Sequence, residues 1–332
     1  MKQLELVIVQ FEEVKRLIEV GRVPQLRLAF ILLDSAVELI MHRQIQEALA
    51  LEHWDFQRLE NYRRAEADGR GNDSIRAEIK DLESQVTSNR RRGKIDRSFP
   101  DKIDFLVEKG SIPNEITPVL KRLHEYRNET YHRDHHRLEV IRPAVLIYFD
   151  TACGVLSTYS PGSVADEDTG PELERFIKGF SGYDDPFDLP ERAANKLREE
   201  VGLDLEGVRD ALTKYLLGRL DELEDNIRYV EGFFTDLLPG DAIRIIQVAE
   251  GDIEAIFNRD VMRSRTYPHE ESDLVTWRER AAALSGITEK HALFTEFAAI
   301  EMSFEELEKQ SIAAVEQIDD QIQMQLDAHR GK

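Results

Sequence analysis

The spacing of apolar residues constrains the fold of this chain more than any other feature. Along its 332 residues, apolar side chains recur at intervals of three and four, and no segment keeps the alternation typical of strands. In residues 24–51 one helical face would carry Leu26, Phe30, Leu33, Val37 and Ile40. The sequence therefore predicts an all-α protein. Helices are expected at residues 2–20, 24–51, 101–110, 111–132, 140–156, 189–201, 204–236, 240–258, 271–285 and 289–328.

Turn-forming and small residues without core formers fill the stretch SPGSVADEDTGP, which ends at Pro171. Such a composition is typical of a linker, so we expect a helical domain at 1–158, a linker at 159–171 and a second helical domain at 172–332. Residues 55–97 are rich in charge and contain the turn-like sequence DGRGND. They predict a polar helical hairpin inserted in the first domain.

The hairpin region ends in the densest basic run of the chain, which comprises Arg90, Arg91, Arg92, Lys94 and Arg97. A run of like charges is usually a solvated helix end. The same side chains would also suit a contact with an RNA backbone. The sequence is compatible with both interpretations.

Charge is distributed unevenly along the chain. Residues 1–150 hold 25 basic and 26 acidic side chains, whereas residues 151–332 hold 19 basic and 39 acidic ones, and the net charge of the chain is −21. A strongly acidic region repels phosphate, so any contact with nucleic acid is expected in the first half. The acidic half is expected to face water or to bind a basic protein partner.

The sequence gives no sign of export or of a membrane span. Cys153 is the single cysteine, which is typical of a reducing compartment. The most apolar stretch, residues 140–156, is short and is interrupted by Arg142, Pro143 and Asp150. We therefore expect a cytoplasmic protein that does not interact with membranes.

Four of the nine histidines fall between His124 and His136, beside several arginines. One interpretation is a solvent-facing helix end, where basic side chains stabilise the helix dipole. A second is a metal site made of His132, His135 and His136, to which Asp134 could add a carboxylate, although nearby arginines oppose a dication and the HExxH pattern is absent.

A third interpretation is RNA cleavage without a metal or other cofactor. Histidine can move protons near neutral pH, and arginine binds phosphate through its planar fork of donors. Arg127 and His132 are five positions apart, so on one helix they point about 140° apart and lie roughly 7.5 Å apart along the axis. One copy makes a poor pocket, whereas two copies facing each other would line one cleft.

The segment RNETYH, Arg127 to His132, resembles the signature of HEPN-domain ribonucleases, in which an arginine, often followed by asparagine, precedes a histidine by four to six positions. It is the one Arg-x4-His match in the chain. The preceding segments SFPDKIDFLVEKG, IPNEI and LHEYRN, and the helix containing AVELIMH, are also similar to that family. The resemblance covers about residues 1–158 and leaves the acidic half unassigned.

The resemblance implies a homodimeric helical bundle whose paired motifs form one active site. It would be an endoribonuclease that leaves a 2′,3′-cyclic phosphate, acting as a toxin or in antiviral defence. Arg127 would hold the scissile phosphate, Asn128 would orient that arginine or the RNA, and His132 would be the general acid and base. On chemical grounds we add four candidate RNA contacts: Arg122, Tyr131, His135 and His136.

Some members of this family bind RNA or regulate other proteins without cutting, so a catalytically inactive RNA-binding protein is the alternative. Active members often act with an antitoxin, which implies a protein partner for this chain. The acidic half is then expected either to regulate the nuclease or to serve as a dimerisation or solubility module.

Overall fold

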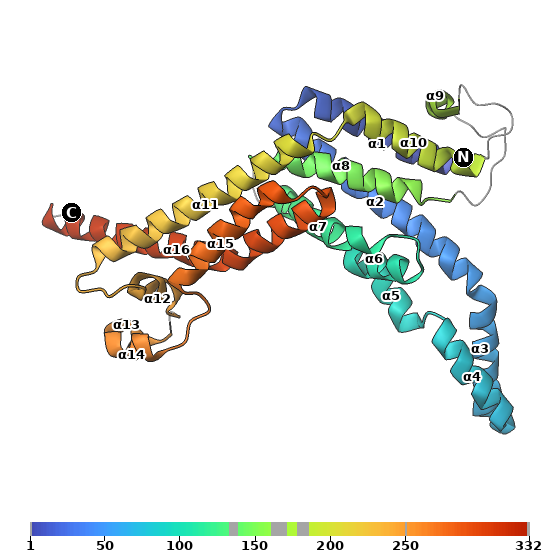
Figure 1. The fold of residues 1–332 in the computed structure, drawn as a ribbon. Helices are drawn as coiled ribbons and strands as arrows, with labels where there is room; N and C mark the ends of the chain where they lie inside the picture. The colour runs from blue at the N-terminus through green and yellow to red at the C-terminus, as the bar shows by residue number, and fades with distance from the viewer. Residues whose placement is uncertain (1, 133–138, 161–170, 178–185, 250, 331–332) are drawn as a thin grey trace. The chain divides into compact units, whose positions relative to one another are not determined.

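A computed structural model describes residues 2–132, 139–160, 171–177, 186–249 and 251–330. Every regular element within these ranges is helical, which confirms the all-α prediction. The chain folds into two compact units, residues 1–203 and 204–332 (Figure 1). No helix in the described ranges is long and apolar enough to cross a membrane.

Four helices form the core of the first unit and lie side by side in Figure 1: α1 (Lys2–Val20), α2 (Val23–Leu51), α8 (Ile141–Ser157) and α10 (Leu189–Val201). The five residues expected on one face of α2 are all buried, which confirms the apolar stripe. α8 is buried over most of its circumference, because it packs between α2 and α10. Asp34 lies in the middle of α2 and is the one charged residue among the buried positions of that helix.

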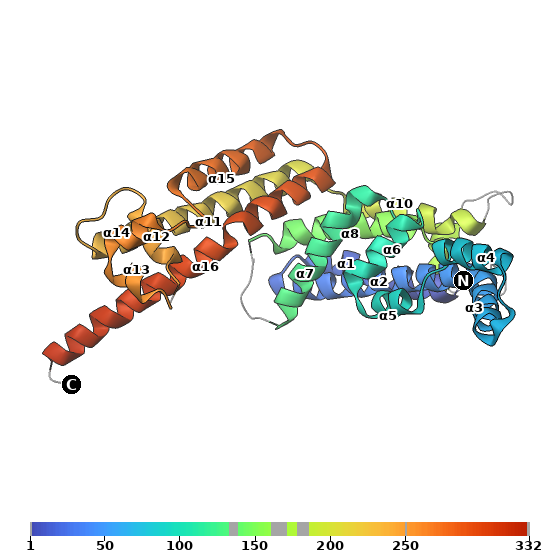
Figure 2. The ribbon, with the colours of Figure 1, turned by 90° about the horizontal axis from the view of Figure 1, so that it is seen from below.

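Two shorter helices pack on this core: α6 (Phe99–Glu108) and α7 (Thr117–His132). α7 contacts α2, α6 and α8, and Figure 2 shows it crossing beside α2 and α8. Its sequence forms a helix because a stripe spaced by three and four faces the core. The buried members of that stripe are Val119, Leu120, Leu123 and Tyr126.

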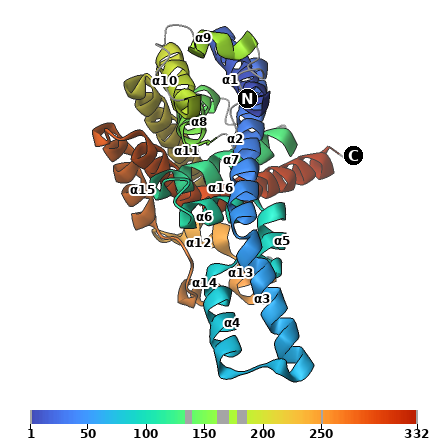
Figure 3. The same cartoon turned by 90° about the vertical axis from the view of Figure 1, so that its right-hand side faces the viewer.

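The polar hairpin expected at 55–97 is present as α3 (His53–Ala65) and α4 (Asp73–Gln85), which lie antiparallel in Figure 3. The turn between them contains Gly69 at φ 76°, a backbone conformation that glycine adopts without strain. The hairpin has a small apolar core of its own. Its buried members are Leu59, Ile79, Leu82 and Val86. α5 (Asn89–Arg97) follows and packs against α6.

The boundary between the two units lies at Leu203, later in the chain than the linker expected at 159–171. The physical reason is α10, whose buried residues pack against α8 and α1. Residues that we assigned to the second domain therefore complete the core of the first.

The second unit is built on α11 (Leu205–Phe233), α15 (Glu271–Ala283) and α16 (Lys290–His329). The single helix expected over 240–258 is instead two short ones, α12 (Asp241–Gln247) and α13 (Ile253–Phe257). The break is stabilised by Asp252, whose side chain caps α13 by accepting a hydrogen bond from the backbone N–H of Ala255. α14 (Arg259–Ser264) was not expected.

Candidate active site around Arg127

Arg127 of α7 lies beside the buried carboxylate of Asp34, which belongs to α2. The Arg127 Nε atom lies 3.5 Å from Asp34 Oδ2, and the arginine side chain is 29% exposed. Asp34 itself is 1% exposed. A guanidinium at the protein surface is thus connected to a carboxylate in the core.

Two further side chains bind the same carboxylate. The buried Tyr148 hydroxyl of α8 donates a hydrogen bond of 2.7 Å to Asp34 Oδ1. Burial, followed by the charge of Asp34, raises the pKa of Tyr148 well above its usual value, so the phenol keeps its proton. His124 Nδ1 of α7 lies 2.9 Å from Asp34 Oδ1. Because a carboxylate can only accept, this contact places the imidazole proton on Nδ1.

The ring of His124 is also fixed by stacking. It lies face to face with the ring of Phe99, the first residue of α6, with centroids 3.9 Å apart and planes inclined by 5°. α2, α6 and α8 therefore each supply one side chain to this cluster. We call Asp34, Phe99, His124, Arg127 and Tyr148 the Asp34 cluster.

Asn128 contacts the arginine that precedes it. Arg127 Nη1 donates a hydrogen bond of 2.9 Å to Asn128 Oδ1. The resemblance implies that Asn128 orients either Arg127 or the RNA, and this contact is compatible with the first of these predictions. The arginine thus contacts a carboxylate of α2 and an amide of its own helix.

The remaining predicted residues differ in what the structure describes. Tyr131 and His132 are the last two residues of α7, which places Arg127 and His132 on one continuous helix as expected. The position of His132 is therefore about 140° around the helix axis from that of Arg127. His135 and His136 lie outside the described residues, as does Asp134 of the metal alternative.

Arg122 has an environment unlike that expected of an RNA contact. It is 8% exposed, its Nη1 donates a hydrogen bond of 2.8 Å to Glu125 Oε2, and its guanidinium lies 4.8 Å from the Tyr126 ring centroid. A side chain so covered stabilises the packing of α7. We therefore withdraw Arg122 from the candidate RNA contacts.

Sequence reasoning missed Asp34, His124, Tyr148 and Phe99 as parts of the site. One signal was present, because Asp34 follows five apolar residues in the stretch AFILLDSAVELIM and lies beside Leu33 and Val37 of the predicted apolar face. A charge at a core position needs a partner, which was reason to search for a cation near it. The identity of that cation required the tertiary packing of α7 on α2.

Family models, curated proteins and solved structures were all compared with this chain, and none of them matches it.

Proposed function

We propose that this protein is a metal-independent endoribonuclease in which Arg127 and His132 act on the scissile phosphodiester of RNA. The observation that supports this best is the anchoring of Arg127. Its guanidinium is positioned by Asp34 and Asn128 at the surface of α7, the helix that ends in His132. Holding a phosphate-binding cation in place before the substrate arrives lowers the cost of stabilising charge in the transition state.

In the proposed reaction, the ribose 2′-hydroxyl attacks the adjacent phosphorus atom. A histidine accepts the 2′-hydroxyl proton, and an acid protonates the 5′-oxygen that leaves. The P–O5′ bond breaks as the P–O2′ bond forms, so the products are a 2′,3′-cyclic phosphate and a 5′-hydroxyl. Arg127 would hold the non-bridging oxygens and their developing charge.

The proposal includes a homodimer. Arg127 and His132 occupy positions about 140° apart on α7, so one chain is badly placed to present both to one phosphate. A two-fold axis near the exposed side of α7 would bring a second copy of the pair into the same cleft. Each histidine could then serve one of the two proton transfers.

Cleavage of a labelled single-stranded RNA in the presence of EDTA tests the proposal. The wild type should cut, and His132→Ala should lower the rate about 100-fold or more, because a general acid or base contributes this much. His53→Ala, at an exposed histidine of α3, is the matched control and should cut as the wild type does. Equal cutting by His132→Ala and His53→Ala would refute the role of His132, and activity lost with EDTA would favour the metal alternative.

One observation favours a second candidate, a catalytically inactive RNA-binding or regulatory protein. The contact of Arg127 with Asp34 also joins α7 to α2, so it would serve a purely structural role equally well. RNA binding without cleavage in the same assay would support this candidate. For the acidic second unit we propose a regulatory role, either as a cover for the RNA cleft or as the docking site of an antitoxin or another basic partner. If the second unit covers the cleft, removal of residues 204–332 should raise the cleavage rate of the isolated protein.

A further inference from the structure

α5 has two faces of different character, although five of its nine residues are basic. Arg91 and Arg92 are paired within the protein. Arg91 Nη1 donates to Glu108 at 3.2 Å, and Arg92 donates to the Thr87 carbonyl at 2.9 Å. Arg92 also lies 3.3 Å from Glu52. These two arginines hold α5 against its neighbours.

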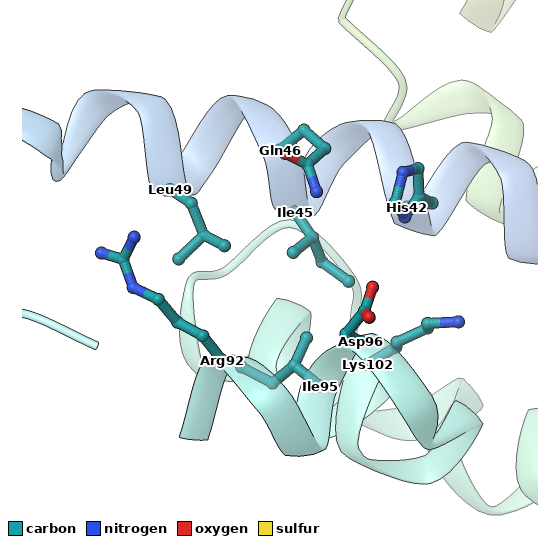
Figure 4. A pocket seen from close by; sticks show the side chains of 8 residues that line it. All are labelled: His42, Ile45, Gln46, Leu49, Arg92, Ile95, Asp96 and Lys102. Carbon is teal, nitrogen blue, oxygen red and sulfur yellow. The ribbon is translucent and has the colours of Figure 1, made fainter. Parts of the chain in front are cut away.

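The side of α5 that faces α2 is visible in Figure 4, where Arg92 and Ile95 point toward Ile45 and Leu49. Ile95 is 2% exposed and anchors this contact. The cavity between the two helices has a volume of about 200 Å³ and is partly lined by apolar side chains. The packing therefore fixes which residues of α5 point outward.

The outward face carries Arg90, Lys94 and Arg97. At 100° per residue these positions fall within an arc of about 60°, and they extend over about 10 Å of helix. All three side chains are exposed. Among the described residues none of the three makes an ion pair or a side-chain hydrogen bond, unlike Arg91 and Arg92. We call these three residues the outer α5 cations.

The outer α5 cations border an open hollow of about 530 Å³. Its lining also includes Gly93, where an added Cβ would meet no atom within 4 Å. Glycine is disfavoured inside a helix, and packing does not require it here. Because Gly93 has no side chain, a ligand can approach the backbone of α5 closely at this position. The lining contains one carboxylate, Asp101, so cations predominate.

The hollow adjoins the Asp34 cluster through the chain itself. Ser98, which lines the hollow, is followed by Phe99, whose ring stacks on His124. Two residues of extended chain span at most about 7 Å, so Arg97 and the start of α6 lie in one region of the surface. The hollow is therefore joined directly, through Ser98, to a residue of the Asp34 cluster.

We propose that the outer α5 cations bind the phosphate backbone of single-stranded RNA that extends from the site at Arg127. The inference rests on the proposed function for its choice of ligand. A row of unpaired cations along an open surface fits a polyanion better than a single small anion, which proteins usually enclose. Binding at this surface should not depend on the base sequence of the RNA, because phosphates are the same at every nucleotide.

The test measures binding separately from cutting. The triple variant Arg90→Gln, Lys94→Gln, Arg97→Gln is made in the His132→Ala protein, and its affinity for a fluorescent RNA is measured in EDTA over a range of salt. The control triple variant removes three exposed cations of the hairpin region: Arg64, Arg70 and Lys80. Circular dichroism before each titration establishes that both proteins are folded.

A plot of log K against log salt concentration has a negative slope. Each phosphate contact that is lost makes this slope shallower by about 0.7 for a single strand. The outer α5 variant should therefore lose about 2 units of slope and bind RNA about 10-fold more weakly at low salt. The hairpin variant should keep the slope of its parent. Equal slopes for the two variants would overturn the proposal. Polyglutamate serves as an acidic polypeptide probe, and the proposal would also be overturned if it bound as tightly as RNA and competed with RNA.

The two proposals fail differently. If the wild type binds RNA through α5 but never cuts it, the proposed nuclease function is refuted and the α5 contact stands. If the wild type cuts RNA while the outer α5 variant binds as its parent does, the α5 contact is refuted and the nuclease function stands.

Discussion

Two buried carboxylates, Asp34 in the first unit and Asp241 in the second, gather side chains in different ways. Asp241 is fully buried and accepts from Arg263 Nη2 at 2.6 Å, from Arg244 Nη1 at 3.1 Å and from the backbone N–H of Leu238 at 3.0 Å. The hydrogen bond from Arg263 is the main cause that lowers the pKa of Asp241 to about 2. This is a closed ion-pair cluster that joins α12 to α14.

Asp34 instead binds one phenol and one imidazole closely, and its contact with Arg127 is longer. The distances are 2.7 Å to Tyr148, 2.9 Å to His124 and 3.5 Å to Arg127. A phosphate that approaches Arg127 therefore competes with a weaker internal ion pair than it would at Arg263. A buried acid can thus either neutralise an arginine within the protein or position that arginine for another anion.

Replacement of the arginine in each cluster should give the sharpest contrast. Arg127→Ala should lower RNA cleavage about 100-fold or more, since it removes the proposed phosphate ligand. Arg263→Ala should lower the thermal midpoint and leave cleavage by the folded protein unchanged. RNA cleavage and circular dichroism melts of both variants check this. Equal loss of cleavage in folded Arg263→Ala and Arg127→Ala would contradict the different roles of the two arginines.

Replacement of Asp34 or Asp241 by asparagine should distinguish an acid that positions an arginine for catalysis from an acid that stabilises the fold. Asp34→Asn should lower kcat about 10-fold with a smaller change in KM, because the guanidinium loses its fixed position. Asp241→Asn should cost about 2 kcal/mol of unfolding free energy, since two arginines lose their counterion, and should not change kcat. Steady-state kinetics and urea unfolding measure both quantities. An unchanged kcat in folded Asp34→Asn would show that the Asp34 cluster is only structural.

Tyr148→Phe should have a smaller effect on the same cluster. It removes one buried hydrogen bond to Asp34 and should cost about 1 kcal/mol of stability. Because burial raises the pKa of Tyr148, absorbance titration of the wild type should show a tyrosine that ionises only when the protein unfolds in alkali. That late step should disappear in Tyr148→Phe, and its persistence would place the late tyrosine elsewhere.

The acid dependence of stability should come in part from Asp241. Its folded pKa of about 2 lies below the ordinary 3.8, so the folded state favours the charged form. The resulting stabilisation is complete above about pH 5 and is lost as the pH falls toward 2, with a magnitude of about 2 kcal/mol for this buried carboxylate. Urea unfolding at pH 5 and pH 3 should show this loss in the wild type. Asp241→Asn should show less of it, and an equal loss in both would contradict the assignment.

Local sequence patterns were sufficient to predict most helices. The segments expected at 2–20 and 189–201 are α1 and α10, because an apolar stripe and a turn residue mark each of them. The helix expected over 240–258 was wrong in its interior, where the Asp252 cap competes with helix continuation. The end of the first unit was misplaced because a turn-rich stretch does not reveal that α10 returns to pack on α8.

The candidate site was predictable only in the part that lies on α7. Arg127 and Asn128 were found because their spacing to His132 is a local pattern. The contact of Arg127 with Asp34 joins residues far apart in the sequence and depends on how α7 crosses α2, which no local pattern encodes. The burial of Arg122 also follows from that crossing.

The chemistry of the RNA ends tests the central claim most directly. A single-stranded RNA is incubated with the wild type, Arg127→Ala or His132→Ala in EDTA, and the fragments are examined by mass spectrometry. The expected result is a 2′,3′-cyclic phosphate and a 5′-hydroxyl from the wild type, with almost no fragments from either variant. Fragments with 5′-phosphates, or equal cutting by the wild type and both variants, would contradict the assignment of Arg127 and His132 as the catalytic pair.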